Sequence, residues 1–193
     1  YNTAVGVEAL RLNTTGFHNS AVGALALHSN VSGWHNVAMG FQAMENNQFG
    51  QENTAIGSRS LLLNNNGNSN IAIGFEALKG NTTGSGNIAI GHSAANRQTN
   101  SGGNTSVGFE AGYYNQSGSQ NVMLGYQAGK GAALHSKSGG IFIGYQAGQN
   151  EVTGDRLYIE NSNSNTPLIY GEFDNDYVPV SYTHLRAHET AQY

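Results

Sequence analysis

Two histidines and a glutamate at one position of a repeated pattern have the clearest potential for chemistry. His18, His35 and Glu52 are spaced 17 residues apart. If successive copies of the pattern stack, two imidazoles and a carboxylate lie one above another, and these are groups that bind Zn²⁺ and related ions. A polar corner without a ligand is the alternative, and the sequence favours it. We therefore expect no metal site.

Aromatic residues accompany the same corner. Phe17 and Trp34 directly precede the two histidines, and Phe49 lies near this place in the next copy. Exposed stacked rings can bind sugar faces or a protein partner, whereas rings between chains contribute packing. Packing against a neighbouring chain is the favoured interpretation. The alternative is a binding site, whose candidate residues are Phe17, Trp34, Phe49, His18 and His35.

Catalytic groups are scarce in the chain. No aspartate precedes Asp155, so residues 1–150 supply neither a Ser-His-Asp triad nor an aspartate-rich calcium loop. Stacking would place Glu76 and Glu110 about 9.6 Å apart, close to the limit of about 9.5 Å for paired-carboxylate hydrolysis. Their column, which begins with Glu8, has the mixed composition of a solvated face. We predict no catalytic residues, no enzyme activity and no cofactor.

Composition excludes several classes of function. The 193 residues include 8 Lys and Arg against 12 Asp and Glu, a net charge of −4, which argues against nucleic-acid binding. The absence of cysteine excludes disulfides and thiolate metal sites. No run of about 18 apolar residues is present, so we expect no membrane insertion. The sequence contains 27 glycines and only 2 prolines.

A 17-residue repeat dominates the chain. Each unit begins with asparagine and has glycine four residues later, and a ninth copy follows a two-residue insertion. The asparagine column is Asn2, Asn19, Asn36, Asn53, Asn70, Asn87, Asn104 and Asn121. The glycine column is Gly6, Gly23, Gly40, Gly57, Gly74, Gly91, Gly108, Gly125 and Gly144. Because the register is so regular, we interpret these residues as structural.

The pattern within each unit predicts an all-β fold. Two short strand-like stretches are separated by glycine and asparagine corners, and no helical period runs through the unit. Such short strands bury little surface alone, so consecutive copies must stack at about 4.8 Å. We predict a parallel β-solenoid, or β-roll, of about nine 17-residue coils over residues 1–150. Stacked asparagines would form hydrogen-bonded ladders along the rod.

Two columns of small residues predict oligomerisation. One precedes the aliphatic residue before each glycine and begins with Ala4 and Ala21, and the other begins with Ala9 and Ala26. The core of so slim a coil is small relative to the conformational entropy lost on ordering the chain. We therefore expect the alanine columns to form a flat face that is buried against another chain.

The repeat motifs resemble those of a known family. Asn-Ser-Ala-Val-Gly at 19–23, with relatives at 53–57 and 87–91, is similar to the head repeat of YadA-type trimeric autotransporter adhesins. Related arrays with Asn-Thr-Thr-Gly corners, as at 13–16 and 81–84, occur in bacterial surface proteins and phage tail fibres. The resemblance covers residues 2–148 and implies a left-handed β-roll, a homotrimer and display on a stalk. The family repeat is typically shorter than 17 residues.

The C-terminal part breaks the repeat. Runs at 157–160 and 168–173 flank a Ser/Asn turn, which predicts a β-hairpin cap or connector over residues 151–180. Residues 181–193 depart from every earlier pattern. We interpret them as a non-native tail and exclude them from functional reasoning.

The resemblance implies an exported fibrous module, the head or shaft of a cell-surface adhesin. It would lie outside the cell at the outer membrane and attach to a host or environmental surface ligand, either protein or glycan. A virion-borne phage tail-fibre shaft is the first alternative, because it uses the same rod. An ice- or glycan-binding solenoid is the second, although the threonine row at Thr3, Thr54 and Thr105 is interrupted. A polysaccharide lyase is a further class, but it would need clustered acids or bases on one face, which this sequence lacks.

Overall fold

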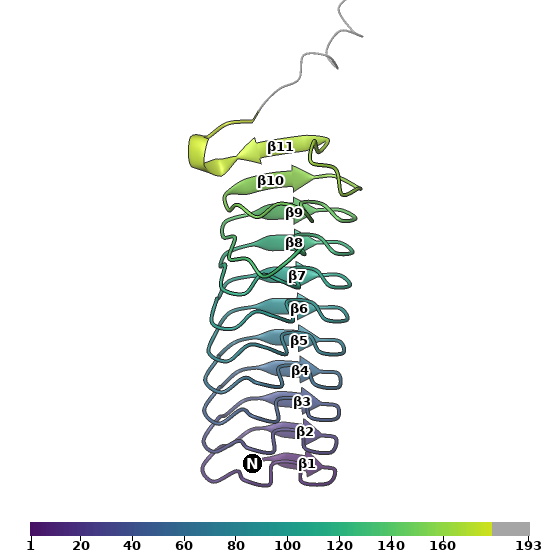
Figure 1. Ribbon diagram of the computed structural model, residues 1–193. Helices are drawn as coiled ribbons and strands as arrows, with labels where there is room; N and C mark the ends of the chain where they lie inside the picture. Colours follow the sequence, from purple (N-terminus) through teal and green to yellow (C-terminus); the bar gives the residue numbers. More distant parts are fainter. Residues whose placement is uncertain (179–193) are drawn as a thin grey trace, which may run out of the picture.

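The computed structural model describes residues 1–178, which form one column of stacked coils (Figure 1). We number the coils from Asn2, so that coil 2 begins at Asn19 and coil 9 at Gly140. The predicted tail, residues 181–193, lies outside the described residues, as do the last two residues of the predicted hairpin segment.

Eleven short strands form a single sheet in chain order. The first nine strands are β1 (Thr3–Val5), β2 (Ser20–Val22), β3 (Val37–Met39), β4 (Thr54–Ile56), β5 (Ile71–Ile73), β6 (Ile88–Ile90), β7 (Thr105–Val107), β8 (Val122–Leu124) and β9 (Ile141–Ile143). They are followed by β10 (Arg156–Ile159), β11 (Ile169–Glu172) and the 3₁₀ turn η1 (Phe173–Asn175). Strands β1 to β10 are parallel, and like residues lie over like: Ala4 pairs with Ala21, which pairs with Ala38. The predicted β-solenoid is confirmed.

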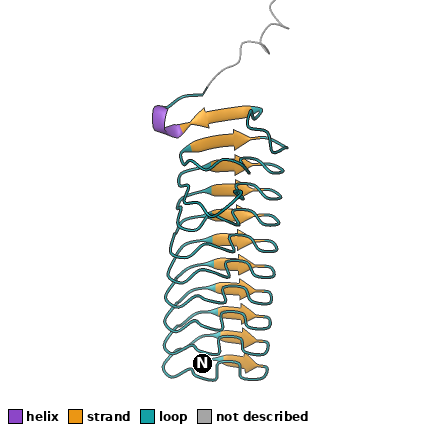
Figure 2. Ribbon diagram, viewed as in Figure 1, coloured by secondary structure: helices purple, strands orange, loops and turns teal. Residues whose placement is uncertain are grey.

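Each coil contains one strand, where the sequence analysis predicted two (Figure 2). The prediction of a second strand is wrong, because the backbone after the glycine turns. In coil 2, Leu25 and Leu27 have φ of +62° and +50°, and the amide of Ala26 donates to the carbonyl of Gly23. Left-handed residues at alternate positions reverse the chain direction, which an extended strand does not allow. The coils still hydrogen-bond here, since the Leu27 amide donates to Ala43 O at 3.0 Å.

Asparagine side chains hydrogen-bond along the rod in two ladders. In the first, the backbone amide of Asn53 donates to Asn36 Oδ1 at 3.0 Å, and Asn53 Nδ2 donates to the carbonyl of Gly67 at 2.8 Å. In the second, Asn47 Nδ2 donates to Asn30 Oδ1 at 2.9 Å. Each ladder residue therefore satisfies a buried backbone group at a corner, where water has no access.

Glycine recurs at two positions of the unit, the column listed above, which includes Gly40, and a second column, which includes Gly50. Gly40 has φ of +136°, and a Cβ added to it would lie 2.7 Å from the carbonyl oxygen of Gly57. Gly50 belongs to the other column and needs no positive φ, but its added Cβ would lie 2.6 Å from the carbonyl oxygen of Gly67. Close approach of the next coil excludes a side chain at both positions.

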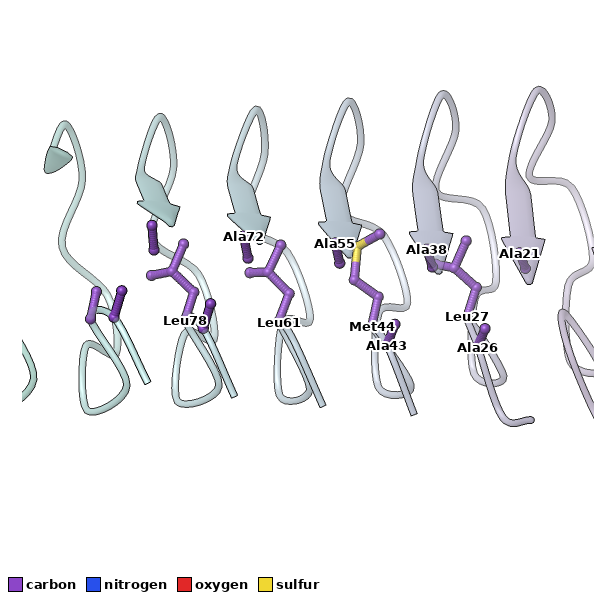
Figure 3. Packing of buried hydrophobic residues seen from close by; sticks show 14 of the residues in the cluster. Ala21, Ala26, Leu27, Ala38, Ala43, Met44, Ala55, Leu61, Ala72 and Leu78 are labelled. Carbon is purple, nitrogen blue, oxygen red and sulfur yellow. The ribbon is translucent and has the colours of Figure 1, made fainter. Parts of the chain in front are cut away.

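The core is a narrow row of alanine with leucine or methionine inside the coils (Figure 3). The middle residue of each strand from β2 to β9 points inward and is buried, as Ala38 and Ala55 illustrate. Leu27, Met44 and Leu61 face them from the turn and are fully buried. The prediction that the alanine columns face a second chain is therefore wrong from coil 2 onward, because these alanines are buried inside the coils with the leucines and Met44.

The filling of the core changes along the rod. Coils 7 to 9 have Gly112, Gly129 and Gly148 in place of leucine, whereas Met123 and Phe142 replace the inward alanine of the strand in coils 8 and 9. A Cβ added to Gly129 would lie 2.7 Å from Met123 Cγ. The large side chain thus moves from the turn to the strand, and two separate clusters result, because both positions are small in coils 6 and 7.

The predicted hairpin is present and is continuous with the solenoid. Strands β10 and β11 pair antiparallel, and β10 also pairs parallel with β9, with Tyr158 opposite Phe142. Their rings are 5.8 Å apart, and Tyr170 contacts Tyr158 edge to face at 5.3 Å. These three rings cover the C-terminal end of the core.

Candidate functional site

The outer side of the sheet is a long, mostly apolar surface. It consists of the first and third residues of β1–β9 and of the residue after each glycine of the first glycine column, and we call it the apolar face. Strand geometry produces it, since the middle residue of each strand points into the core and its neighbours point outward. Val22, Met39, Ile56 and Ile90 on this face are 37–44% exposed. None of its positions holds Asp, Glu, Lys or Arg.

An aromatic ladder forms one border of the apolar face. Phe75, His92, Phe109, Tyr126 and Tyr145 stack ring on ring, with centroids 5.1–5.2 Å apart. The spacing follows from the coil repeat, because each ring occupies the same position one coil further along. Stacked rings of this kind supply a large apolar area for lateral contact.

The predicted aromatic corner is formed in part. Phe17 and Trp34 stack with centroids 5.9 Å apart and an interplanar angle of 4°, and the His18 and His35 rings stack at 5.0 Å. Phe49 does not join them: its side chain is 48% exposed, and no ring pair among the described residues includes it. It lies two residues before the column of Phe17 and Trp34, which is occupied in its own coil by Gln51.

The histidine corner does not form the three-ligand metal site considered above. Nδ1 of His18 and Nε2 of His35 are 2.8 Å apart and share a hydrogen bond, so these nitrogens face each other. Glu52 instead accepts a hydrogen bond from Ser69 Oγ. Over residues 1–178, no group of three or more histidine, aspartate or glutamate side chains is placed to hold a metal ion.

Glu76 and Glu110, which share one position of the repeat unit, each form an ion pair with a lysine. Glu76 accepts from Lys79 Nζ at 2.8 Å, and Glu110 accepts from Lys130 Nζ at 2.6 Å. Burial would raise the pKa of Glu76, but the hydrogen bond and charge of Lys79 outweigh it and leave the pKa below its usual value. The pKa of Glu110 is lowered in the same way by Lys130 and Gln127. A general acid needs the opposite shift.

A buried lysine near the C-terminal end of the core was missed by the sequence analysis. Lys137 is 2% exposed, and its Nζ donates to the carbonyl of Glu151 at 2.9 Å and lies 4.6 Å from the centre of the Phe142 ring. Burial lowers the pKa of Lys137 to about 7, although the Glu151 carboxylate opposes this shift. The available signal was a lysine at a position that is glycine in most coils.

A groove beside coils 4 to 8 was also missed. Its volume is about 590 Å³, and its walls include Leu63, Arg97, Tyr113, Tyr114 and Leu134. These residues lie where the repeat becomes irregular, and that irregularity was the signal that could have located the groove.

Comparison with family models, with curated proteins and with solved structures finds no match to this chain. Among the described residues, no helix has the length and apolar character needed to cross a membrane.

Proposed function

We propose that this chain is an attachment module, the head or shaft segment of an exported fibrous adhesin that acts as a homotrimer. The supporting observation is the apolar face, which runs along nine coils without a charged residue. Apolar surface of this extent on a soluble protein marks an interaction site.

A second copy of the same chain is the partner that fits this face. The coils of the second copy have the same spacing, so rows of side chains on two parallel copies stay in register over the whole rod. Any other partner would have to match the spacing of the coils. An uncharged face also removes the desolvation cost that opposes burial of charged groups.

A rod of stacked coils suits attachment because it is stiff and repetitive. Every coil is hydrogen-bonded to its neighbours through strands and asparagine ladders. Three parallel copies would present each exposed residue three times, and linked sites bind a surface more strongly than one site does. A tail-fibre shaft would use the same rod, and flanking sequence separates the two: a membrane anchor for the adhesin, a virion attachment region for the fibre.

The mass in solution tests the proposal first. Light scattering should give about three times the 20.4 kDa of one chain. Ile90→Lys places a charge on the apolar face and should yield monomers, whereas Leu12→Lys, at a similarly exposed position off this face, should leave the trimer intact. A monomeric wild-type chain would refute the homotrimer.

Attachment is tested with beads that carry the protein. We expect wild-type beads to adhere to surfaces coated with glycans or extracellular proteins, and Ile90→Lys beads to adhere at least about tenfold less, because avidity is lost. Adhesion of Trp34→Ala beads in the same assay tests whether the aromatic corner contributes to attachment. Equal adhesion of trimeric and monomeric forms would refute the role of the trimer in attachment.

A further inference from the structure

The groove beside coils 4 to 8 arises from a local break in the repeat. At the eleventh position of the unit, Leu63, Gly80, Arg97 and Tyr114 follow one another in coils 4 to 7. Gly80 leaves a notch between larger neighbours, and a Cβ added to it would lie 2.7 Å from the carbonyl oxygen of Asn96. The insertion of coil 8 contributes Leu134 to the wall. Regular coils elsewhere lack this combination.

The groove combines aromatic rings with a cation. Tyr113 and Tyr114 meet edge to face with centroids 4.7 Å apart, and both are half-buried. The guanidinium of Arg97 is exposed and lies 5.8 Å from the centre of the Tyr113 ring. Small-molecule sites typically have this character: an apolar and aromatic lining with a few polar groups that orient the ligand.

Arg97 is the uncompensated charge of this groove. Lys79 and Lys130 are nearby cations, but they are ion-paired with Glu76 and Glu110 at 2.8 and 2.6 Å. Arg97 forms no ion pair with any of residues 1–178. Its planar guanidinium is therefore available to bind a carboxylate through two parallel hydrogen bonds.

We propose that the groove binds an oligosaccharide that contains a carboxylate sugar. The guanidinium of Arg97 would bind the carboxylate, and a tyrosine ring would pack against the apolar face of a sugar ring. Thr82, Thr99 and Gln116 also line the groove. The two threonine hydroxyls donate to backbone carbonyls and keep lone pairs that accept from sugar hydroxyls, and the Gln116 amide can donate and accept. A single free cation suits one carboxylate and does not suit a polyanion such as nucleic acid.

This inference gives a ligand class to the attachment function and rests on that proposal for its setting. The groove and the apolar face lie at different positions of the repeat unit: position seven in coil 5 and positions ten to thirteen in coils 4 to 7 line the groove, and positions two, four and six form the face. Pairing of copies through the apolar face therefore uses none of the groove residues.

Titration calorimetry on the soluble chain tests the groove with matched sugars. The probes are 3′-sialyllactose and lactose, which differ by one carboxylate sugar, and trigalacturonate with its methyl ester. We expect each acidic sugar to bind at least about tenfold more tightly than its neutral counterpart, since hydrogen bonds between a guanidinium and a carboxylate are stronger than neutral ones. Equal or absent binding of both members of each pair would overturn the proposal.

Variants identify the residues that bind the sugar. Arg97→Gln should abolish the preference for the acidic sugar, and Tyr113→Ala should weaken the binding of acidic and neutral sugars alike. Arg11→Lys is the control, because Arg11 is an exposed arginine in coil 1 that is paired with Glu8. Circular dichroism must show an unchanged fold. Unaltered binding by Arg97→Gln, or equal binding of an oligoglutamate peptide, would overturn the assignment.

The groove and the attachment function can fail separately. If wild-type and Arg97→Gln beads adhere equally well and the soluble chain ignores acidic sugars, the groove proposal is wrong and attachment stands. If the soluble chain binds acidic sugars through Arg97 but its beads adhere to no surface, the groove proposal stands and attachment is wrong.

Discussion

Replacement of a ladder asparagine by aspartate would test the asparagine ladders most directly. Asn70 is fully buried in coil 5. Its Nδ2 donates to Asn53 Oδ1 at 3.1 Å and to the carbonyl of Gly84 at 2.9 Å, and its Oδ1 accepts from the backbone amide of Asn87 at 3.0 Å. Asn70→Asp keeps the shape and the acceptor but replaces the donor with a second oxygen. That oxygen would face two other oxygens.

The structure sets the size of the effect. Two hydrogen bonds are lost, each contributing about 0.5–1.5 kcal/mol, and a carboxylate is buried without a cation, which costs about 3 kcal/mol or more. We expect Asn70→Asp to lower the free energy of unfolding by at least about 3 kcal/mol at pH 7. Asn70→Ala should cost about 1–3 kcal/mol, because only the amide of Asn87 is left unpaired.

Urea unfolding at one protein concentration measures these changes. Far-UV circular dichroism reports the whole rod, and Trp34, the single tryptophan, reports coil 2. Coincident transitions justify a two-state treatment, which repeat proteins do not always obey. Asn66→Asp is the matched control, since Asn66 is exposed in the adjacent coil and its side chain makes no hydrogen bond to the described residues. It should change stability by less than about 0.5 kcal/mol. Equal effects of the two aspartate substitutions would refute the reasoning.

Two further predictions concern buried polar atoms. Oγ of Ser106 is buried without a hydrogen-bond partner in residues 1–178, at a position that is alanine in coils 1 to 6. Ser106→Ala should therefore raise the free energy of unfolding by about 1 kcal/mol in the same urea assay. A clear loss of stability would contradict this. Burial lowers the pKa of Lys137 from 10.5 to about 7. At a pH between these two values, Lys137 carries a proton in the unfolded chain but not in the folded chain. Stability should therefore rise with pH, by up to about 1.4 kcal/mol per unit, between about pH 7.5 and 9.5. Lys137→Met should remove this dependence, and parallel pH profiles of the two proteins would disprove the assignment.

The repeat was readable from the sequence because each position meets the same neighbours in every coil. An asparagine above an asparagine needs no knowledge of the fold beyond the stacking itself, so the solenoid and its ladders followed from the spacing. The stacking of Phe17 on Trp34 and of His18 on His35 followed in the same way. Phe49 failed because it belongs to a different column, and a near position in the chain does not imply a near position on the rod.

Sequence alone did not determine which way each column points. Alanine suits both a chain contact and a thin core, and only the backbone turn between strand and leucine shows that the alanines face inward from coil 2 onward. The same turn explains the missing second strand, since left-handed residues at alternate positions carry no obvious signature when they are leucine or glutamine.

The sequence by itself determined that equal units stack in register, because the same residue types recur every 17 positions over eight units and meet when successive units stack. The tertiary structure decided where the irregular residues come together. Gly80, Arg97, Tyr114 and Leu134 are far apart in the chain and belong to four coils, yet the stacking brings them to one groove. The physical reason is that backbone hydrogen bonds bring successive coils within a few ångströms of one another, whatever the length of chain between them.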